Sequence, residues 1–188
     1  DKEIDGNYNA ALALRQPGSS FKPFEYAAAL KKGYTPQTIV FDLPTQFSTA
    51  CAASDNFNST YPCYAPGNYD DKFRGPMTFT TALAQSINVP AVKVLYLAGM
   101  QNVIDLARSM GITTLGEPKD YGLSLALGAA EVRLLDLVSA YTGFANDGVL
   151  HPPTGILRIS DKNGRTLEEF KEAPKTVLDA EVARGISY

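Results

Sequence analysis

A serine and a lysine three residues apart are the first candidates for chemistry in this chain. Ser19 and Lys22 lie in the segment Arg15–Phe24, where a predicted helix begins. Three residues make nearly one helical turn, so the two side chains share a face. A serine hydroxyl becomes an effective nucleophile when a base takes its proton, and a lysine can be that base when burial and nearby positive charge lower its pKa. The spacing therefore indicates Ser19 as a nucleophile and Lys22 as its base.

The same two residues also have a structural interpretation. Ser19 can be a helix cap and Lys22 a solvated surface lysine, and Ser-x-x-Lys occurs by chance in many proteins. The chain contains this pattern once. The pair therefore needs support from a second motif.

Enzymes that use Ser-x-x-Lys chemistry also carry a Ser-x-Asn element and a Lys-Thr-Gly element. Two segments, Ser54–Asn56 and Ser86–Asn88, match Ser-x-Asn. The first has no helix after it and is interpreted as a polar surface turn. The second lies between two predicted helices, where a short loop can present both side chains to a cleft. We therefore favour Ser86 and Asn88 as site residues.

No segment supplies the third motif. Lys162–Gly164 has the right ends but is predicted to be a hairpin tip, and Lys175–Val177 lacks the glycine. Neither is counted as a Lys-Thr-Gly element.

Composition narrows the function classes. The formal charge of -3 and the absence of a basic cluster give no indication of a nucleic-acid partner. His151 is the only histidine, and the two cysteines are Cys51 and Cys63, so we expect neither a zinc centre nor a histidine-based triad. No cofactor is implied. The cysteines are either a local disulfide or two unrelated small residues.

The predicted elements are mostly helices, separated by one long irregular segment, 34–76. Helices are expected over 20–30, 78–84, 88–99, 103–110 and 131–145, and after Asp179. Thr78 and Asn88 are expected to cap the second and third of these. One short strand is expected at 38–41, and a hairpin at 156–159 and 166–170. No apolar run is long enough to span a bilayer.

The segment Arg15–Phe24 resembles the active-site segment of the bifunctional, class A penicillin-binding proteins. Further stretches agree with that family in the same order, namely Asn9–Ala11, Gln85–Lys93, Leu125–Val132 and Ala140–Val149. The resemblance covers most of the chain, and several long stretches that match together are far more specific than one motif.

The resemblance implies an α+β fold, in which helices flank a five-stranded antiparallel sheet and an all-helical subdomain is added. We expect this chain to be mainly α, the helical subdomain with a small β-hairpin. On this basis 1–188 is a partial transpeptidase domain, without its N-terminal strands and its C-terminal Lys-Thr-Gly strand. Residues 50–71 are expected to be an inserted loop.

The resemblance also implies an activity, that of a D,D-transpeptidase that cross-links peptidoglycan stem peptides and is acylated by β-lactams. Ser19 would form the acyl-enzyme, Lys22 would accept its proton, Ser86 would pass a proton to the leaving group, and Asn88 would hold substrate and lysine. The parent protein is expected to be anchored in the bacterial membrane by an N-terminal helix outside this chain, with its catalytic part outside the cytoplasm.

Three alternatives stay open at this stage. A serine β-lactamase or a D,D-carboxypeptidase would pass the acyl group to water, and a non-catalytic sensor would keep the fold without the reaction. Because the resemblance places the Lys-Thr-Gly strand after Tyr188, we expect the 188-residue chain itself to be acylated slowly or not at all.

Overall fold

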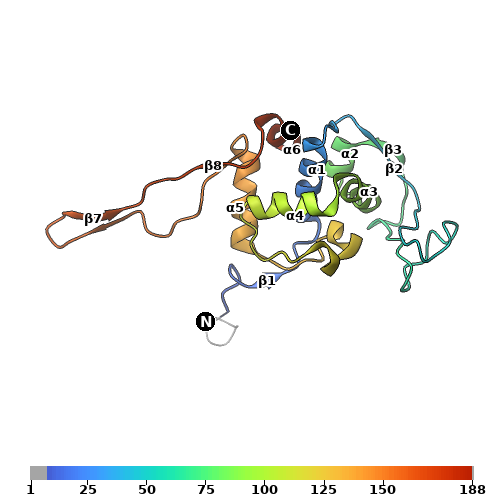
Figure 1. The fold of residues 1–188 in the computed structure, drawn as a ribbon, viewed down its shortest axis with the longest axis horizontal. Helices are drawn as coiled ribbons and strands as arrows, with labels where there is room; N and C mark the ends of the chain where they lie inside the picture. The colour runs from blue at the N-terminus through green and yellow to red at the C-terminus, as the bar shows by residue number, and fades with distance from the viewer. Residues whose placement is uncertain (1–7, 188) are drawn as a thin grey trace.

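The helix α1 (Lys22–Lys31) lies at the centre of the computed structural model, which describes residues 8–187. Helices α2, α3, α4 and α6 pack against it (Figure 1). Seven of its ten residues are buried. The apolar core therefore forms around α1, and a side chain at its beginning is held by packing on several sides.

The local sequence explains where α1 starts and stops. A 3-10 turn, η1 (Gly18–Phe21), leads into the helix, and Pro23 stands in its first turn, where the missing N–H costs nothing. An alanine run fills its middle, and Gly33 follows its end with a φ of 97°. The helix predicted over 20–30 is confirmed, with its first turn wound as a 3-10 helix.

The remaining α-helices are α2 (Phe79–Ala84), α3 (Asn88–Ala98), α4 (Met100–Ser109), α5 (Leu134–Ala145) and α6 (Ala180–Ser187). The described part of the chain also contains the 3-10 turns η2 (Pro118–Asp120) and η3 (Gly122–Leu127). Thr78 caps α2 as predicted, since its side chain accepts a hydrogen bond from Thr81 N at 3.1 Å.

Three details of these helices differ from the predictions. Asn88 is the first residue inside α3 and not its cap, because its side chain is used elsewhere. Helix α4 begins at Met100 and not at residue 103, since Gly99 already ends α3. Helix α5 begins at Leu134 and not at residue 131, because the two preceding residues pair with an N-terminal strand.

The buried face of α5 is not the one that spacing groups together. The sequence places Val132, Leu135, Val138 and Tyr141 on one face, yet Val138 is 56% exposed. The buried residues of the helix are Leu137, Ala140, Gly143 and Phe144. Helix α6 packs against α5, and Phe144 contacts Phe24 on α1, two neighbours that the period alone does not indicate.

Within residues 8–187 the strands form four two-stranded antiparallel sheets. The pairs are β1 (Leu14–Arg15) with β4 (Val132–Arg133), β2 (Ile39–Asp42) with β3 (Gly75–Thr78), β5 (Val149–Leu150) with β8 (Lys175–Thr176), and β6 (Arg158–Ser160) with β7 (Thr166–Glu169). Strand β2 confirms the short strand expected at 38–41, and β6 with β7 confirms the hairpin. Figure 1 shows this hairpin extending away from the helices.

The segment between β2 and β3 is irregular, as predicted, but it is held by side-chain hydrogen bonds. Gln46 Nε2 donates to the carbonyl oxygens of Asp55 and Asn58, at 2.8 and 3.0 Å, and its Oε1 accepts from Tyr64 N at 2.7 Å. A disulfide joins Cys51 and Cys63, whose Cα atoms are 5.6 Å apart. Of the two interpretations of the cysteines, the structure has the paired one.

Among residues 8–187, no helix is both long and apolar enough to cross a membrane.

Candidate active site

Lys22 is the point at which the two predicted motifs meet. Its side chain is buried at the start of α1, with 1% of its surface exposed. Its Nζ donates hydrogen bonds to the Ser86 carbonyl oxygen (2.6 Å), to Asn88 Oδ1 (2.8 Å) and to Ser86 Oγ (3.2 Å). Three acceptors match the three protons of an ammonium group. The structure thus brings Lys22, Ser86 and Asn88 together from positions more than 60 residues apart.

The connection between α2 and α3 aims Ser86 at the lysine. Ser86 has a φ of 55°, in the left-handed region that costs a non-glycine residue about 1–2 kcal/mol. Its backbone N–H and that of Ile87 still bond to the last turn of α2, so the left-handed residue ends that helix. The reversal turns both oxygens of Ser86 toward Lys22. The contact of Lys22 with Ser86 and Asn88 therefore requires a strained backbone at Ser86, which indicates a functional constraint.

A residue missed by the sequence reasoning, Asn68, holds the other side of this connection. Its Oδ1 accepts hydrogen bonds from Asn88 N (3.1 Å) and Val89 N (3.2 Å), and so caps α3 from the irregular segment. Its Nδ2 donates to the buried Asp42 Oδ1 (2.8 Å) and to the Lys72 carbonyl oxygen (2.7 Å). Asn68 therefore ties the start of α3 to strand β2.

The amide of Asn88 is oriented by a bond on its far side. Asn88 Nδ2 donates to the Gly67 carbonyl oxygen at 3.1 Å, which leaves Oδ1 to accept from Lys22. The sequence gives one indication that another segment must cap α3, because Ile87, the residue before the helix, has no polar side chain that could do so.

Ser19 lies in the η1 turn just before α1, with its side chain exposed. Its hydroxyl makes no hydrogen bond to the described residues and is not one of the partners of Lys22 Nζ, whereas the hydroxyl of Ser20 is used locally, on the Pro17 carbonyl oxygen. Of the two adjacent serines, Ser19 is the one whose hydroxyl is free to meet a ligand.

Two other stretches that carry the family resemblance position this turn. A Cβ atom added to Gly128 would lie 2.2 Å from the Gly18 carbonyl oxygen, so only glycine allows the two backbones to come this close. Tyr141 Oη donates to the Ser20 carbonyl oxygen at 2.7 Å. The turn that presents Ser19 is thus packed against η3 and α5.

Burial sets the electrostatics of the lysine. Removal from water lowers the pKa of Lys22 to about 8, while the nearby carboxyl group of Glu25 acts in the opposite direction. From the sequence we expected burial and nearby positive charge to lower this pKa together. In the structure burial lowers it, and the charge that acts on Lys22 is the negative one of Glu25. Near neutral pH a usable fraction of Lys22 is therefore neutral and able to accept a proton.

The rejected motif candidates lie away from this site. Ser54–Asn56 is a surface turn inside the disulfide loop, where Asn58 Nδ2 donates to Asp55 Oδ2, whereas Ser86 and Asn88 contact Lys22. Lys162–Gly164 is the exposed tip of the hairpin, and Lys175 and Thr176 form the exposed strand β8.

No group of three or more His, Cys, Asp or Glu side chains that could hold a metal ion occurs in the part of the chain that the structure describes. His151 is half-exposed and contacts the carboxyl group of Glu172 near the base of the hairpin.

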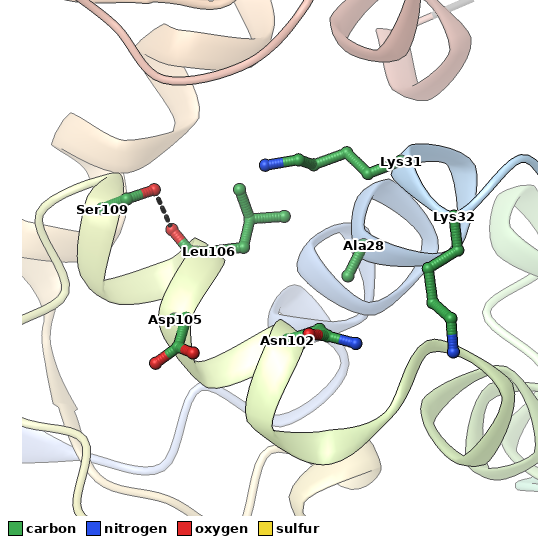
Figure 2. A pocket seen from close by; sticks show the side chains of 7 residues that line it. All are labelled: Ala28, Lys31, Lys32, Asn102, Asp105, Leu106 and Ser109. Atoms are coloured by element: carbon green, nitrogen blue, oxygen red, sulfur yellow. Dashed lines mark hydrogen bonds between the residues drawn. The ribbon is translucent and has the colours of Figure 1, made fainter.

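A hollow between α1 and α4 is separate from the Lys22 site. Figure 2 shows its lining residues, Ala28, Lys31, Lys32, Asn102, Asp105, Leu106 and Ser109. Lys22 and Lys31 are the two ends of α1, roughly 13 Å apart at the usual rise per residue. The hollow therefore takes no part in the chemistry of Lys22.

Comparison with known proteins places this geometry in a family. The family model described as the penicillin binding protein transpeptidase domain matches residues 7–188. The chain is 42% identical over 162 residues to penicillin-binding protein 1A of Aquifex aeolicus, covering 85% of this chain and 20% of the relative. It is 35% identical over 172 residues to penicillin-binding protein 2D of Bacillus subtilis, covering 91% of this chain and 23% of the relative. The chain thus spans about a fifth of the length of these relatives.

Solved structures agree with the sequence relatives. The crystal structure of penicillin-binding protein 1A from Haemophilus influenzae superposes with a TM-score of 0.75 at 31% identity, over 90% of this chain and 24% of that one. The PonA1 protein from Mycobacterium tuberculosis in complex with penicillin V gives 0.78 at 23% identity, over 96% and 48%, a likeness of fold alone. The expected fold class is confirmed, and the chain belongs to the penicillin-binding protein transpeptidase family.

Proposed function

We propose that this chain carries the acyl-serine machinery of a D,D-transpeptidase that cross-links peptidoglycan stem peptides, with Ser19 as nucleophile. The observation that carries the proposal is that buried Lys22 contacts both Ser86 and Asn88. The exposed Ser19 lies three residues before this lysine in the chain. Membership in the transpeptidase family supports it.

In the first half of the reaction, Ser19 Oγ attacks the carbonyl carbon of the penultimate D-alanine of a stem peptide. Neutral Lys22 accepts the hydroxyl proton as the new ester bond forms. The amide bond to the terminal D-alanine then breaks, and its nitrogen takes a proton from Lys22 through Ser86 Oγ, which lies 3.2 Å from Nζ. Free D-alanine leaves, and the acyl group stays on Ser19.

In the second half, an amino group of a neighbouring stem attacks the ester. It gives up a proton along the same path, the bond to Ser19 breaks, and a cross-link forms. Asn88 Oδ1 holds the lysine throughout at 2.8 Å. The backbone N–H of Ser19 stabilises the oxyanion, and the resemblance assigns a second donor to a Lys-Thr-Gly strand.

We extend the proposal to the ligands of the domain and to its location in the cell. A β-lactam presents a strained amide that resembles the substrate terminus, so it should acylate Ser19 and remain attached. The domain should work outside the cytoplasm, where peptidoglycan and an oxidising environment suited to the Cys51–Cys63 disulfide occur together. Residues 1–188 then form part of the transpeptidase domain, with 50–71 as an inserted loop.

Labelling of the full-length protein with a fluorescent penicillin tests the proposal. The wild type should be labelled stably, Ser19→Ala should lose the label, and the matched control Ser20→Ala should keep most of it. Rapid turnover of the label would favour a β-lactamase or carboxypeptidase instead. Complete absence of labelling in the wild type would favour a non-catalytic module.

A further inference from the structure

A second ionisable group lies buried beside the proposed base. Glu25 follows Lys22 by three residues on α1, so both side chains leave the same face of the helix. None of the Glu25 surface is exposed. Neither of its carboxyl oxygens has a hydrogen-bond partner among the described residues. A buried carboxyl group without partners is costly and calls for a functional explanation.

Two tyrosine hydroxyls share this buried region. Tyr26 Oη on α1 and Tyr64 Oη in the irregular segment are also buried without a hydrogen-bond partner. Both feel the charge of Glu25, which adds to the effect of burial and raises the pKa of Tyr64 to about 12. They therefore stay neutral and polar around the carboxyl group. Tyr64 directly follows Cys63, so the residue just after the disulfide-closed loop supplies part of this buried region.

The other charged residues on α1 and on the helices packed against it are not buried with Glu25. They lie toward solvent, exposed or half-exposed: Lys31 on α1 itself, Lys93 on α3, Asp105 and Arg108 on α4, and Glu181 and Arg184 on α6. Helix α2 and the turns η1 and η3 contain no charged residue. Lys93 is coupled to Asp42, and Arg184 pairs with Asp147. Of the charged residues on α1, α2, α3, α4 and α6, Lys22 is the one that is buried together with Glu25.

We propose that Glu25 is a positioning residue that sets the charge of Lys22, because the two groups are enclosed together at the start of α1 and the charge of one stabilises the opposite charge on the other. The proposal rests on the assignment of Lys22 as the base in the proposed function. It adds a group that touches neither substrate nor Ser19 and acts through the lysine.

The direction of the coupling follows from burial and charge. Burial raises the pKa of Glu25 well above its usual range, and Lys22 lowers it again. In turn the negative form of Glu25 raises the pKa of Lys22, against the effect of burial. When Glu25 is neutral, Lys22 loses its proton more easily and becomes a base. When Glu25 is ionised, its charge stabilises the ammonium form of Lys22 instead.

Titration of Lys22 by nuclear magnetic resonance tests this coupling in the 188-residue chain, without requiring catalysis. The Cε signal of Lys22, assigned with Lys22→Met, is followed against pH in the wild type and in Glu25→Gln. The midpoint should move to lower pH in Glu25→Gln, because an amide cannot ionise. Glu168→Gln, on the exposed hairpin strand β7, removes the same charge far from α1 and should leave the midpoint in place.

Two further variants keep the test decisive. Glu25→Met replaces the buried polar group with an apolar side chain of similar length, so it should fold even where the amide does not, and it should give the same shift to lower pH. Linkage also requires the reciprocal effect, so Lys22→Met should raise the midpoint of the Glu25 carboxyl carbon. An unchanged Lys22 midpoint in both Glu25 variants would overturn the proposal.

The consequence for catalysis separates this proposal from the proposed function. In the full-length protein, the acid limb of the pH profile for penicillin acylation should move to lower pH in Glu25→Gln, and Glu25→Asp should restore it toward the wild type. A role in packing alone would lower the rate without moving the limb. Loss of acylation in the wild type would remove the proposed function and leave the measured coupling intact.

Discussion

The replacement of Asn68 by alanine should destabilise the chain by about 3 kcal/mol. The variant removes the bond from Nδ2 to the buried carboxylate of Asp42, and bonds to charged groups contribute roughly 1.5–3 kcal/mol. It also uncaps the first two N–H groups of α3, at a cost of roughly 0.5–2 kcal/mol. Asp42 keeps the N–H of Arg74 at 2.9 Å and its guanidinium at 3.8 Å, so the loss stays below that of a fully stripped buried charge.

Urea unfolding of the 188-residue chain, followed by circular dichroism, measures this effect. With a slope of about 2 kcal/mol per molar urea, the midpoint should fall by about 1.5 M. The control Asn163→Ala changes an exposed asparagine at the hairpin tip and should cost less than about 0.5 kcal/mol. A loss below about 1 kcal/mol in Asn68→Ala would refute the view that this side chain holds α3 to β2.

Three other predictions concern Ser86, Lys22 and the disulfide. Ser86→Ala should slow acylation of the full-length protein by roughly 10²-fold, the usual size for a lost proton-transfer partner, whereas Ser54→Ala should leave the rate nearly unchanged; the reverse order would contradict the choice of motif. Acylation should accelerate as the pH rises through about 8, because the neutral form of Lys22 is the base, and a flat profile across that value would argue against it. Mass spectrometry of the non-reduced protein should find linked Cys51 and Cys63 peptides, and reduction should cost roughly 3 kcal/mol; alkylation of both thiols in oxidised, folded protein would exclude the bridge.

The parts of the site that could be predicted are those that short sequence motifs indicate. Ser-x-x-Lys before an alanine-rich helix, and Ser-x-Asn between two helices, identify Lys22, Ser86 and Asn88 before any contact is known. Their meeting at Lys22 Nζ then follows from packing of α1 against α3. The role of Ser19 stays a prediction, since its hydroxyl makes no contact that assigns one.

The parts that were not predictable depend on contacts between distant segments. Asn68 stands in a turn-rich stretch, and nothing near it in the sequence indicates that it caps a helix 20 residues later. Glu25 has the spacing of an ordinary helical surface residue, and only the packing around α1 buries it completely. For α5 the apolar period is ambiguous, and tertiary neighbours such as α6 and Phe24 decide which face is buried.

The irregular segment has two parts with different tasks, which bears on its interpretation as an insertion. The stretch between Cys51 and Cys63 is mostly exposed, and its contacts are largely its own. The stretch after it behaves differently, since Tyr64 encloses Glu25, Gly67 orients Asn88, and Asn68 caps α3. Gln46 holds the start of this stretch, since its Oε1 accepts a hydrogen bond from Tyr64 N, and the disulfide closes the loop that precedes it. An insertion confined to the disulfide-closed tip can therefore vary without moving the lysine, whereas a change at its base acts directly on the acceptors of Lys22.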